Sequence, residues 1–410
     1  MIDRDAPFLS YGRQAIDAED LAAVAEVLRS DFLTTGPAVP AFEAAVAEAV
    51  GAPQAVACSS GTAALHLAAL ALDLAPGQRV IVPSLTFVAT ANVVRYAGAE
   101  VVFADCDPET ALMGPEHLDQ ALERARAAGS GALTAVFPVH MAGQCTAPNE
   151  IAGLAERHGL RVVTDACHAL GTRYGGADGR AIAVGACRHE DMAVFSFHPL
   201  KTVTMGEGGV ITTADSETAR RLRRLRSHGL EREPAAFVAR DDGFGPDGSV
   251  NPWYYELQEL GFNYRASDIH CALGRSQIEK LSRFVERRRA LAARYDSLIA
   301  RLAPAVRPLG RTPDCRPAWH LYVVLIDFAA VELDRATVMN ALREQGIGTQ
   351  VHYIPVHRQP YYRDRYGVLE LPGTEAHYAR CLSLPLHPNM AESDVARVVD
   401  ALARIVAPNG

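Results

Sequence analysis

Short apolar runs alternate with alanine-rich, helix-like segments between about residue 55 and about residue 215. Apolar runs of about five residues have the usual length of buried strands, and the segments between them are long enough to form helices. The alternation predicts an α/β fold with a mostly parallel sheet that helices cover on both faces. The expected strands are 79–83, 101–105, 134–137, 161–165 and 193–197.

The pattern changes after residue 230. Residues 231–255 are rich in Gly, Pro and Asp and predict a long excursion over the surface. A long helical pattern from Ser267 to about Leu302 follows. The remainder predicts a smaller α+β unit, with a strand at 320–325 and a last helix from about Glu392 to Ile405. We therefore expect a large domain over 1–265, and a bridging helix with a small C-terminal domain over 266–410.

Composition and charge exclude several classes of partner. The 410 residues are 49% hydrophobic, which is enough for a large core and a second, smaller one, and the formal net charge is −8. Such a charge gives no general attraction to nucleic acid or to anionic membranes. The start, Met1 to Asp5, lacks an apolar core of the signal-peptide type, and no stretch reaches the roughly 18 apolar residues of a membrane span. We expect a cytoplasmic protein.

The eight cysteines are scattered, with no CxxC pair and no ligand spacing with histidine. This usage is typical of small buried thiols in a reducing compartment, and it indicates no metal site.

Lysine is nearly absent. Of the 40 Lys and Arg residues only Lys201 and Lys280 are lysines, although arginine serves equally well for salt bridges. A guanidinium stays protonated and cannot act as an amine nucleophile, so a retained lysine marks chemistry. Lys201 lies in a loop just after a strand-like stretch and is our candidate nucleophile. Lys280 lies in an amphipathic run, 276–281, where a solvated helix face accounts for it.

Three further features are ambiguous when each is taken alone. Residues 59–66 begin a helix with hydroxyls and a glycine, which suits either a phosphate or a plain helix cap. Asp165 ends an apolar strand, where it could keep a cofactor nitrogen protonated or simply cap a turn. Phe87 begins the next helix and could stack on a flat ring or fill the core. Gly206 to Gly209 reads as a tight turn behind Lys201.

The order of these features along the chain carries more information than any one of them. A helix start with hydroxyls and glycine is followed by an aromatic residue, a strand-end Asp with a trailing His, and then Ser-x-His-x-x-Lys before a glycine turn. This order resembles the fold-type I pyridoxal-phosphate (PLP) enzymes and, within them, the sugar aminotransferases of the DegT/DnrJ/EryC1/StrS family. The resemblance runs from Tyr11 to the final helix.

The resemblance implies a PLP site with residues in defined places. Lys201 would form the Schiff base, Asp165 would pair with the pyridine nitrogen, and His168 would join them in catalysis. The residues expected to hold the phosphate or flank the ring are Gly61, Thr62, Ser196, Phe87 and His168. Asn263 and Arg265 match family positions that reach into the neighbouring subunit, which implies a homodimer with shared sites.

The resemblance also implies a sugar-side surface. Its expected members are Tyr11, Asp31, Phe32, Leu33, Thr34, Arg265, His320, Tyr322, His352 and Tyr353. Several stretches, among them 165–171 and 350–356, look closer to the transaminases that aminate a UDP-linked 4-keto sugar on the route to pseudaminic acid. The expected substrates are therefore a nucleotide-linked 4-keto-6-deoxy sugar and L-glutamate.

Three alternatives remain at this point. The acceptor could be another keto sugar or a keto-cyclitol. The related sugar dehydratases replace the lysine with histidine, so Lys201 argues against that branch. A PLP-binding regulator without turnover would share the fold, because fold alone does not establish function.

Overall fold

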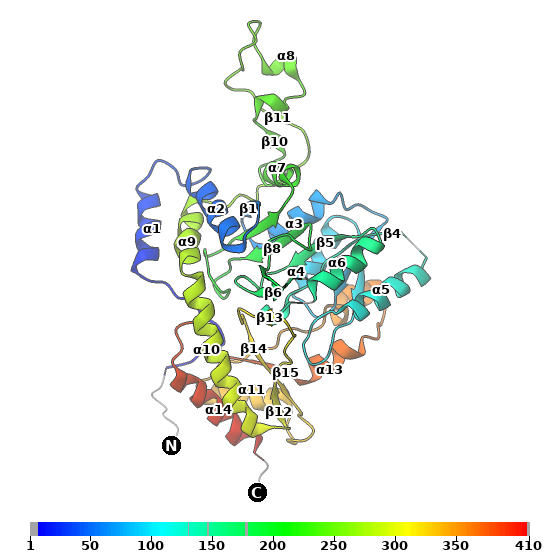
Figure 1. Ribbon diagram of the computed structural model, residues 1–410, viewed down its shortest axis with the longest axis vertical. Coiled ribbons are helices and arrows are strands. Elements are labelled where there is room, and N and C mark those ends of the chain that lie inside the picture. Colours follow the sequence, from blue (N-terminus) through cyan, green and yellow to red (C-terminus); the bar gives the residue numbers. More distant parts are fainter. Residues whose placement is uncertain (1–6, 130, 146, 177–178, 408–410) are drawn as a thin grey trace.

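The computed structural model describes residues 7–129, 131–145, 147–176 and 179–407, so the start at Met1 to Asp5 lies outside the described residues. Within this part of the chain a seven-stranded sheet forms the centre (Figure 1). The strand order is β1 (Gln54–Cys58), β9 (Gly209–Thr213), β8 (Met192–Ser196), β5 (Arg161–Asp165), β4 (Ala132–Val136), β2 (Gln78–Pro83) and β3 (Glu100–Ala104). β9 runs opposite to the other six strands of this sheet, so the predicted mostly parallel α/β fold is confirmed.

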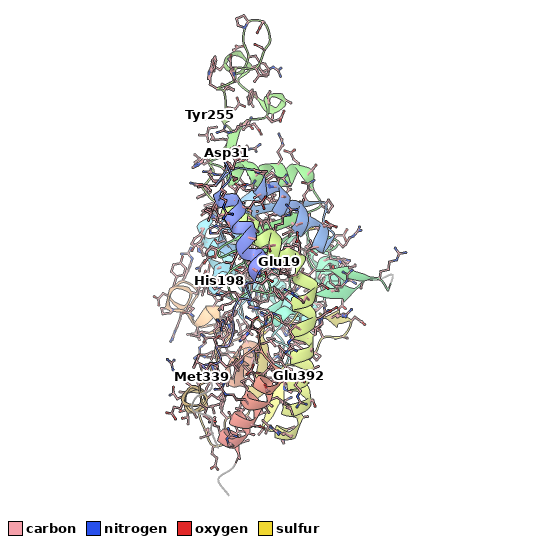
Figure 2. All side chains as sticks on the ribbon, turned by 90° about the vertical axis from the view of Figure 1, so that its left-hand side faces the viewer. Glu19, Asp31, His198, Tyr255, Met339 and Glu392 are labelled. Carbon is pink, nitrogen blue, oxygen red and sulfur yellow. The ribbon has the colours of Figure 1, made fainter. Side chains whose placement is uncertain are left out.

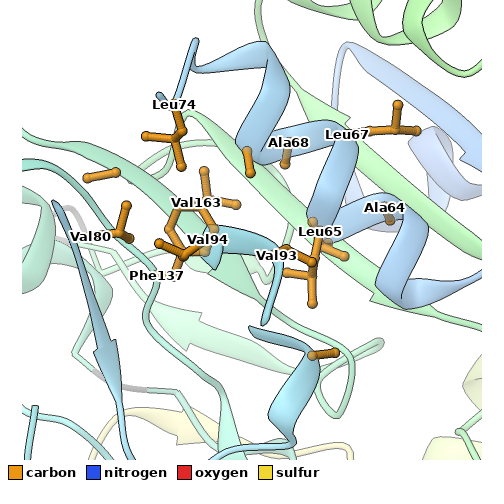
Figure 3. Close-up of a cluster of buried hydrophobic side chains, with 14 of the residues drawn as sticks. Ala64, Leu65, Leu67, Ala68, Leu74, Val80, Val93, Val94, Phe137 and Val163 are labelled. Carbon is orange, nitrogen blue, oxygen red and sulfur yellow. The ribbon is translucent and has the colours of Figure 1, made fainter. Parts of the chain in front are cut away.

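Alternation along each strand explains why both faces are covered. In β2, Val80 and Val82 enter one buried cluster, whereas Ile81 enters another on the opposite face. The first face carries α3 (Gly61–Ala71), α4 (Val88–Tyr96) and α7 (Ser216–Leu225), and the second carries α5 (Pro115–Ala127) and α6 (Pro148–Arg157). Figure 3 shows the first cluster, in which Leu65 and Ala68 of α3 lie close to Val93 and Val94 of α4. Truncating such a buried leucine to alanine costs about 2–5 kcal/mol.

The long helix expected from Ser267 to Leu302 is broken. It consists of α9 (Asp268–Glu279) and α10 (Leu281–Ile299), followed by a short 3₁₀ turn, η3 (Ala300–Leu302). The break falls at Lys280, the C-cap of α9. The two helices run in succession beside the large sheet and down to the C-terminal unit in Figure 1.

Lys280 is buried, which corrects the expectation of a solvated helix face. Only 7% of its side chain is exposed, and its amine pairs with Asp17, Asp20 and Glu19 around the start of α1 (Ala18–Leu28). Asp17 also caps α1 through its carboxylate. The helix α1 packs against α9, as does α2 (Ala38–Val50), so this ion cluster ties the N-terminal segment to the rest of the large unit.

Residues 228–262 form a projecting segment rather than an excursion along the surface (Figure 1). The strands β10 (Leu230–Glu231) and β11 (Glu256–Leu257) pair at its base, and η2 (Pro234–Ala236) and α8 (Arg240–Gly243) lie beyond them. Phe237 is buried against Phe244 and Tyr254, but other apolar side chains of the segment are largely exposed: Val238 is 80% exposed and Trp253 74%.

The C-terminal unit has its own core. A three-stranded antiparallel sheet of β12 (Val306–Pro308), β14 (Tyr322–Ile326) and β15 (Cys381–Leu384) packs with α10, α11 (Arg335–Glu344) and α14 (Glu392–Val406). A smaller sheet is formed by β13 (Cys315–Arg316), β6 (Arg173–Gly175) and β7 (Ala181–Ala183). The predicted C-terminal α+β elements are therefore present, while a domain boundary at residue 265 stays a prediction.

One stretch between β14 and β15 returns to the large sheet. It contains η4 (Val356–Arg358), α12 (Pro360–Tyr366) and α13 (Pro372–Arg380). Val356 and Tyr362 belong to the same buried cluster as α3 and α4, and the Tyr362 hydroxyl donates to Asn92 at 2.8 Å. The backbone N–H of Gly373 donates to the Asp105 carboxylate just after β3. Among the described helices none is long and apolar enough to cross a membrane.

Candidate active site

Two neighbouring parallel strands end at the same edge of the sheet, and both end in a polar residue. Asp165 is the last residue of β5 and pairs in register with Val194 of β8. Ser196 ends β8 two residues later, opposite Gly209 of β9. Because ligands of open α/β sheets bind at the carboxyl ends of the strands, this edge is where the site is expected. The loop that leaves β8 carries Lys201 to the same edge.

A helix start faces the end of β8. Ser60 caps α3 by accepting a hydrogen bond from the Ala63 N–H at 3.1 Å, and Gly61 is the first helical residue. A Cβ on Gly61 would lie 2.8 Å from Cβ of Ser196, so only glycine lets the helix start and the strand end approach this closely. Thr62 follows on the first turn. The N–H groups and the dipole of a helix N-terminus favour an anion such as phosphate.

Lys201 sits in a tight turn, with its N–H donating to the His198 carbonyl at 2.9 Å. Burial lowers the pKa of its amine, while the nearby Cys167 and Asp165 oppose that shift. Among the described residues no carboxylate forms an ion pair with it. The environment therefore favours the neutral, nucleophilic form more than water does. In Figure 2, His198 marks this loop near the middle of the molecule.

The Asp165 carboxylate is buried and held on both oxygens. The Thr90 hydroxyl donates to Oδ2 at 2.7 Å, and the N–H of Cys167 donates to Oδ1 at 3.1 Å. Two donors fix the orientation of the carboxylate. A carboxylate offers about four acceptor positions, so it can still accept a hydrogen bond from a ligand.

Imidazoles and a phenol gather beside Lys201. His168 and His320 have ring centroids 4.3 Å apart, and the Tyr353 hydroxyl lies 3.0 Å from Nε2 of His168. Nδ1 of His352 lies 2.8 Å from the Ser383 hydroxyl, and the Tyr11 ring is 5.5 Å from the His352 ring. The structure thus brings together His168, His320, His352, Tyr353 and Tyr11, which come from four separate parts of the sequence.

These groups are neutral at ordinary pH. Burial, followed by the charge of Lys201, lowers the pKa of His352 to about 3 and that of His168 well below its usual range. Burial also raises the pKa of the Tyr353 hydroxyl. Nδ1 of His168 and Nδ1 of His320 are buried without a hydrogen-bond partner. Buried polar atoms of this kind normally have partners, so a bound ligand would complete them.

The remaining sequence-predicted residues lie elsewhere or at the rim. Phe87 is the N-cap of α4; it is 53% exposed, and its ring centroid lies 5.9 Å from that of Tyr353. Asp31 to Thr34 are all exposed, and Figure 2 draws Asp31 above His198, on the side of the projecting segment. Asn263 is exposed, and Nε of Arg265 is buried without a partner. Among the described residues of one chain, Phe87 contacts the histidine group through Tyr353, whereas residues 31–34, Asn263 and Arg265 make no hydrogen bond or ring contact with it.

Tyr322 was wrongly expected on the sugar side. It is 1% exposed, its ring stacks on Tyr295 at 4.4 Å, and its hydroxyl donates to Asp296 at 2.7 Å. Strand alternation explains the difference, because Tyr322, Val324 and Ile326 all face the C-terminal core. Its side chain therefore packs that core and lines no ligand surface.

Sequence reasoning missed two hydroxyl groups on residues 84–90. Thr90 holds Asp165, as described above. The Ser84 hydroxyl lies 2.6 Å from Nδ1 of His357, whose Nε2 donates to Glu375 at 3.0 Å. This order resembles a serine–histidine–glutamate triad, but Ser84 is fully buried and offers no accessible nucleophile. The four-residue spacing of Thr86 and Thr90 at a helix start was the available signal for the first group.

The donor set fits PLP. Gly61 lies so close to Ser196 that no side chain fits there, which leaves the N–H groups of the helix start open to a phosphate. Lys201 has a lowered pKa, and the Asp165 carboxylate can accept a further hydrogen bond. Nδ1 of His168 and Nδ1 of His320 lack hydrogen-bond partners. Gly61, Thr62 and Ser196 would hold the phosphate end, and Asp165 would hold the ring nitrogen.

Comparison with known proteins agrees with this geometry. The model of the DegT/DnrJ/EryC1/StrS aminotransferase family matches residues 14–403. The chain is similar to Helicobacter pylori PseC, an aminotransferase of pseudaminic acid biosynthesis, at 28% identity and a TM-score of 0.84, covering 97% of this chain and 99% of that one. It is 31% identical to Streptomyces venezuelae DesV, solved with a ketimine intermediate, at a TM-score of 0.82, covering 99% and 100%.

It is also 32% identical to DesI, solved in the presence of its TDP-sugar product, at a TM-score of 0.81, covering 98% of this chain and 93% of that one. Solved neighbours carry PLP in both its aldehyde and its amine form. The chain belongs to the DegT/DnrJ/EryC1/StrS aminotransferase family and is a PLP-dependent sugar aminotransferase.

Proposed function

We propose that this enzyme transfers an amino group from L-glutamate to a UDP-linked 4-keto-6-deoxy sugar, within the pathway to pseudaminic acid. The observation that carries the proposal is the placement of Lys201 beside neutral imidazoles and phenols, with no ion-pair partner for its amine among the described residues. Support for the sugar comes from similarity to PseC and DesI, whose names refer to pseudaminic acid and to a TDP-sugar product.

Lys201 would serve as anchor and as base. Its amine would hold the cofactor and, when free, would move a proton at the substrate carbon. The lowered pKa of Lys201 makes the free amine more available for that transfer than it would be in water. A lysine with a carboxylate partner would remain protonated and could not accept the proton.

Asp165 would keep the pyridine nitrogen protonated. PLP, when bound, supplies the electron sink for the reaction, and a protonated nitrogen strengthens it. Two hydrogen bonds hold the Asp165 carboxylate in place, so that it would pair with the ring nitrogen. His168, three residues further along the chain, would flank the ring.

The sugar side is built from uncharged hydrogen-bonding groups. His320 and His352 lie near Lys201, Tyr353 and Tyr11 pack against His352, and burial keeps all four groups neutral. Neutral imidazoles and phenols suit the hydroxyl and carbonyl groups of a sugar. A dedicated amino-acid transaminase would instead need a small, closed pocket for carboxylates, with a cation at its end.

We further propose that two chains share each site. Asn263, Arg265 and the exposed residues 31–34 are family-matched positions that do not reach the histidine group of their own chain. A second copy related by a two-fold axis would present the same surface in return. The Arg265 guanidinium would then meet a diphosphate or carboxylate of the ligand.

We also propose a cytoplasmic location, because the eight cysteines, all among the described residues, form no disulfide, as is usual in a reducing compartment.

A substrate panel tests the proposal. UDP- and TDP-linked 4-keto-6-deoxy sugars, a keto-cyclitol and simple keto acids are incubated with enzyme and glutamate, and mass spectrometry follows the aminated product together with 2-oxoglutarate. We expect the fastest turnover with the UDP-linked N-acetylated 4-keto sugar. Reaction with keto acids alone would overturn the proposal. A preference for another nucleotide or for a keto-cyclitol would overturn the proposed acceptor but not the sugar aminotransferase activity.

A further inference from the structure

Two threonine hydroxyls form a chain that ends on Asp165. Thr86 and Thr90 lie one helical turn apart, with their Oγ1 atoms 2.9 Å apart, and Thr90 Oγ1 lies 2.7 Å from Oδ2 of Asp165. Thr86 is 1% exposed, Thr90 is fully buried and Asp165 is 6% exposed. The chain is therefore dry, and its hydrogen bonds are stronger than the same bonds would be in water.

The direction of each hydrogen bond follows from the chemistry of the groups. An ionised carboxylate only accepts, so the single proton of the Thr90 hydroxyl goes to Asp165. The competing acceptor, the Phe87 carbonyl oxygen, is 3.4 Å away and is the poorer partner. Thr86 must then donate to Thr90. The order Thr86 to Thr90 to Asp165 makes Thr90 a better donor, because accepting a hydrogen bond polarises its own O–H.

We propose that Thr90 is a positioning residue that holds the Asp165 carboxylate in the orientation that pairs with the cofactor nitrogen, with Thr86 supporting it. The proposal rests on the pairing of Asp165 with the cofactor nitrogen. Oδ2 of Asp165 accepts from Thr90, and without that hydroxyl the carboxylate loses its side-chain donor. It can then turn away from the pyridine nitrogen, so the ion pair that keeps this nitrogen protonated is weaker. The electron sink is weaker as a result.

Of the two donors to Asp165, only Thr90 is a side chain that can be changed without altering the backbone. The Cys167 N–H fixes Oδ1 through the turn after β5. Thr90 and Thr86 approach from the start of α4, the helix whose N-cap is Phe87. One short segment thus contributes an aromatic side chain at the rim of the site and a hydrogen bond to its buried carboxylate.

Valine replaces a threonine hydroxyl with a methyl of nearly the same size, so Thr90→Val separates the hydrogen bond from packing. Thr90→Ser keeps the hydroxyl and serves as the conservative variant. Thr213→Val is the matched control, because Thr213 is 1% exposed and donates at 2.9 Å to the Asp191 carbonyl at the other end of β9. Thermal unfolding of each variant shows whether the fold is retained.

The readout is the chemical shift of the pyridine nitrogen in enzyme loaded with ¹⁵N-labelled PLP, followed by the rate of the half-reaction with glutamate. We expect Thr90→Val to shift the nitrogen signal towards the unprotonated value and to slow the half-reaction about ten- to a hundredfold, the usual weight of a hydrogen bond to a charge. Thr86→Val should shift the nitrogen signal and slow the half-reaction in the same direction, but to a smaller extent. Thr90→Ser and Thr213→Val should resemble wild type.

The outcomes separate this proposal from the one it rests on. Asp165→Asn is measured in the same experiment. If Asp165→Asn leaves the nitrogen protonated as in wild type, the pairing of Asp165 with the ring nitrogen is wrong. If Asp165→Asn loses that proton but Thr90→Val keeps it, Asp165 stands and the role of Thr90 is overturned. Equal loss in Thr90→Ser and Thr90→Val would also overturn it, because packing and not the hydroxyl would be responsible.

Discussion

The only two lysines of this chain have opposite surroundings. Lys280 is 7% exposed and contacts three carboxylates, of Asp17, Glu19 and Asp20. Burial alone would lower its pKa, but the hydrogen bonds to Asp17 and Asp20 outweigh that effect and raise it. Lys201 has no ion pair among the described residues, and burial lowers its pKa. Partner carboxylates, rather than burial, decide which amine stays charged and which can react.

The two regions are also joined. The Gln277 side chain donates to the Ala15 carbonyl at 2.8 Å and to Asp20 at 2.7 Å, and its Oε1 accepts from the Thr204 N–H at 3.3 Å. Thr204 lies in the loop that carries Lys201. The Lys280 cluster therefore supports the reactive loop from behind, and the comparison can be tested by changing either lysine.

Replacing Lys201 by arginine should have the largest effect. The charge is kept, but the amine that binds the cofactor and moves the proton is lost, so turnover should fall by at least about 10⁴-fold and the yellow colour should disappear. Borohydride reduction of wild type with peptide mapping identifies the modified lysine. A label on Lys280, or full activity in Lys201→Arg, would contradict the assignment; Lys280→Arg is the control and should remain yellow.

Replacing Asp165 by asparagine should have the next largest effect. The carboxylate that keeps the ring nitrogen protonated is lost while the shape is retained, and we expect turnover to fall about a hundredfold or more with cofactor still bound. Single-turnover kinetics with glutamate measure the change. Normal transamination by a folded Asp165→Asn enzyme would remove Asp165 from the mechanism.

Mixing two inactive variants should restore about a quarter of wild-type activity. If Lys201 is supplied by one chain and Arg265 by the other, random exchange of Lys201→Ala and Arg265→Ala subunits makes half of the dimers hybrid, and each hybrid has one complete site. Activity is measured after subunit exchange has been proven with a tagged partner. No recovery after proven exchange would show that each site belongs to a single chain.

Replacing Lys280 by methionine should change stability far more than catalysis. The substitution leaves the fully buried Asp20 without its cation, which should cost about 1–3 kcal/mol of unfolding free energy, while the Lys201 loop keeps its own contacts. Denaturant unfolding and steady-state kinetics are compared in the folded range. If Lys280→Met is as stable as wild type but inactive, Lys280 serves catalysis and not stability, and the contrast between the two lysines is wrong.

The smallest effect concerns acid. The hydrogen bond from Lys280, aided by other donors, lowers the pKa of Asp17 from its usual 3.8 to about 2. A lowered carboxyl pKa contributes stability above the usual pKa and loses it as the pH falls through the lowered one. The stability difference between wild type and Lys280→Met should therefore narrow between about pH 4 and about pH 2. A constant difference over that range would mean that Asp17 does not contribute to it.

The comparison also shows what the sequence could predict. The parallel strands, the helix start at residue 61 and the strand-end Asp165 follow from local patterns, and the structure contains them. The burial of Lys280 does not follow, because its carboxylates come from residues 17–20, far away along the chain. The helix break at Lys280 has no glycine or proline to signal it.

The histidine group illustrates both limits. His168, His320 and His352 were expected together from the family resemblance alone, since no spacing along the chain relates them. Tyr322 was misplaced because a strand of apolar residues shows no alternation from which to read its facing side. Thr90 was missed because its partner, Asp165, lies in a different strand–helix unit and only the folded chain joins them.

The span that carries His352 and Tyr353 is fixed at both ends by backbone hydrogen bonds. Gln350 exchanges backbone hydrogen bonds with Ser383 of β15, in the C-terminal unit, while the N–H of Val356 donates to Ser84 beside the large sheet. The short span between them carries both substrate-side residues. The positions of His352 and Tyr353 therefore depend on how the C-terminal unit is placed against the large sheet, because each end of their span is fixed to a different unit.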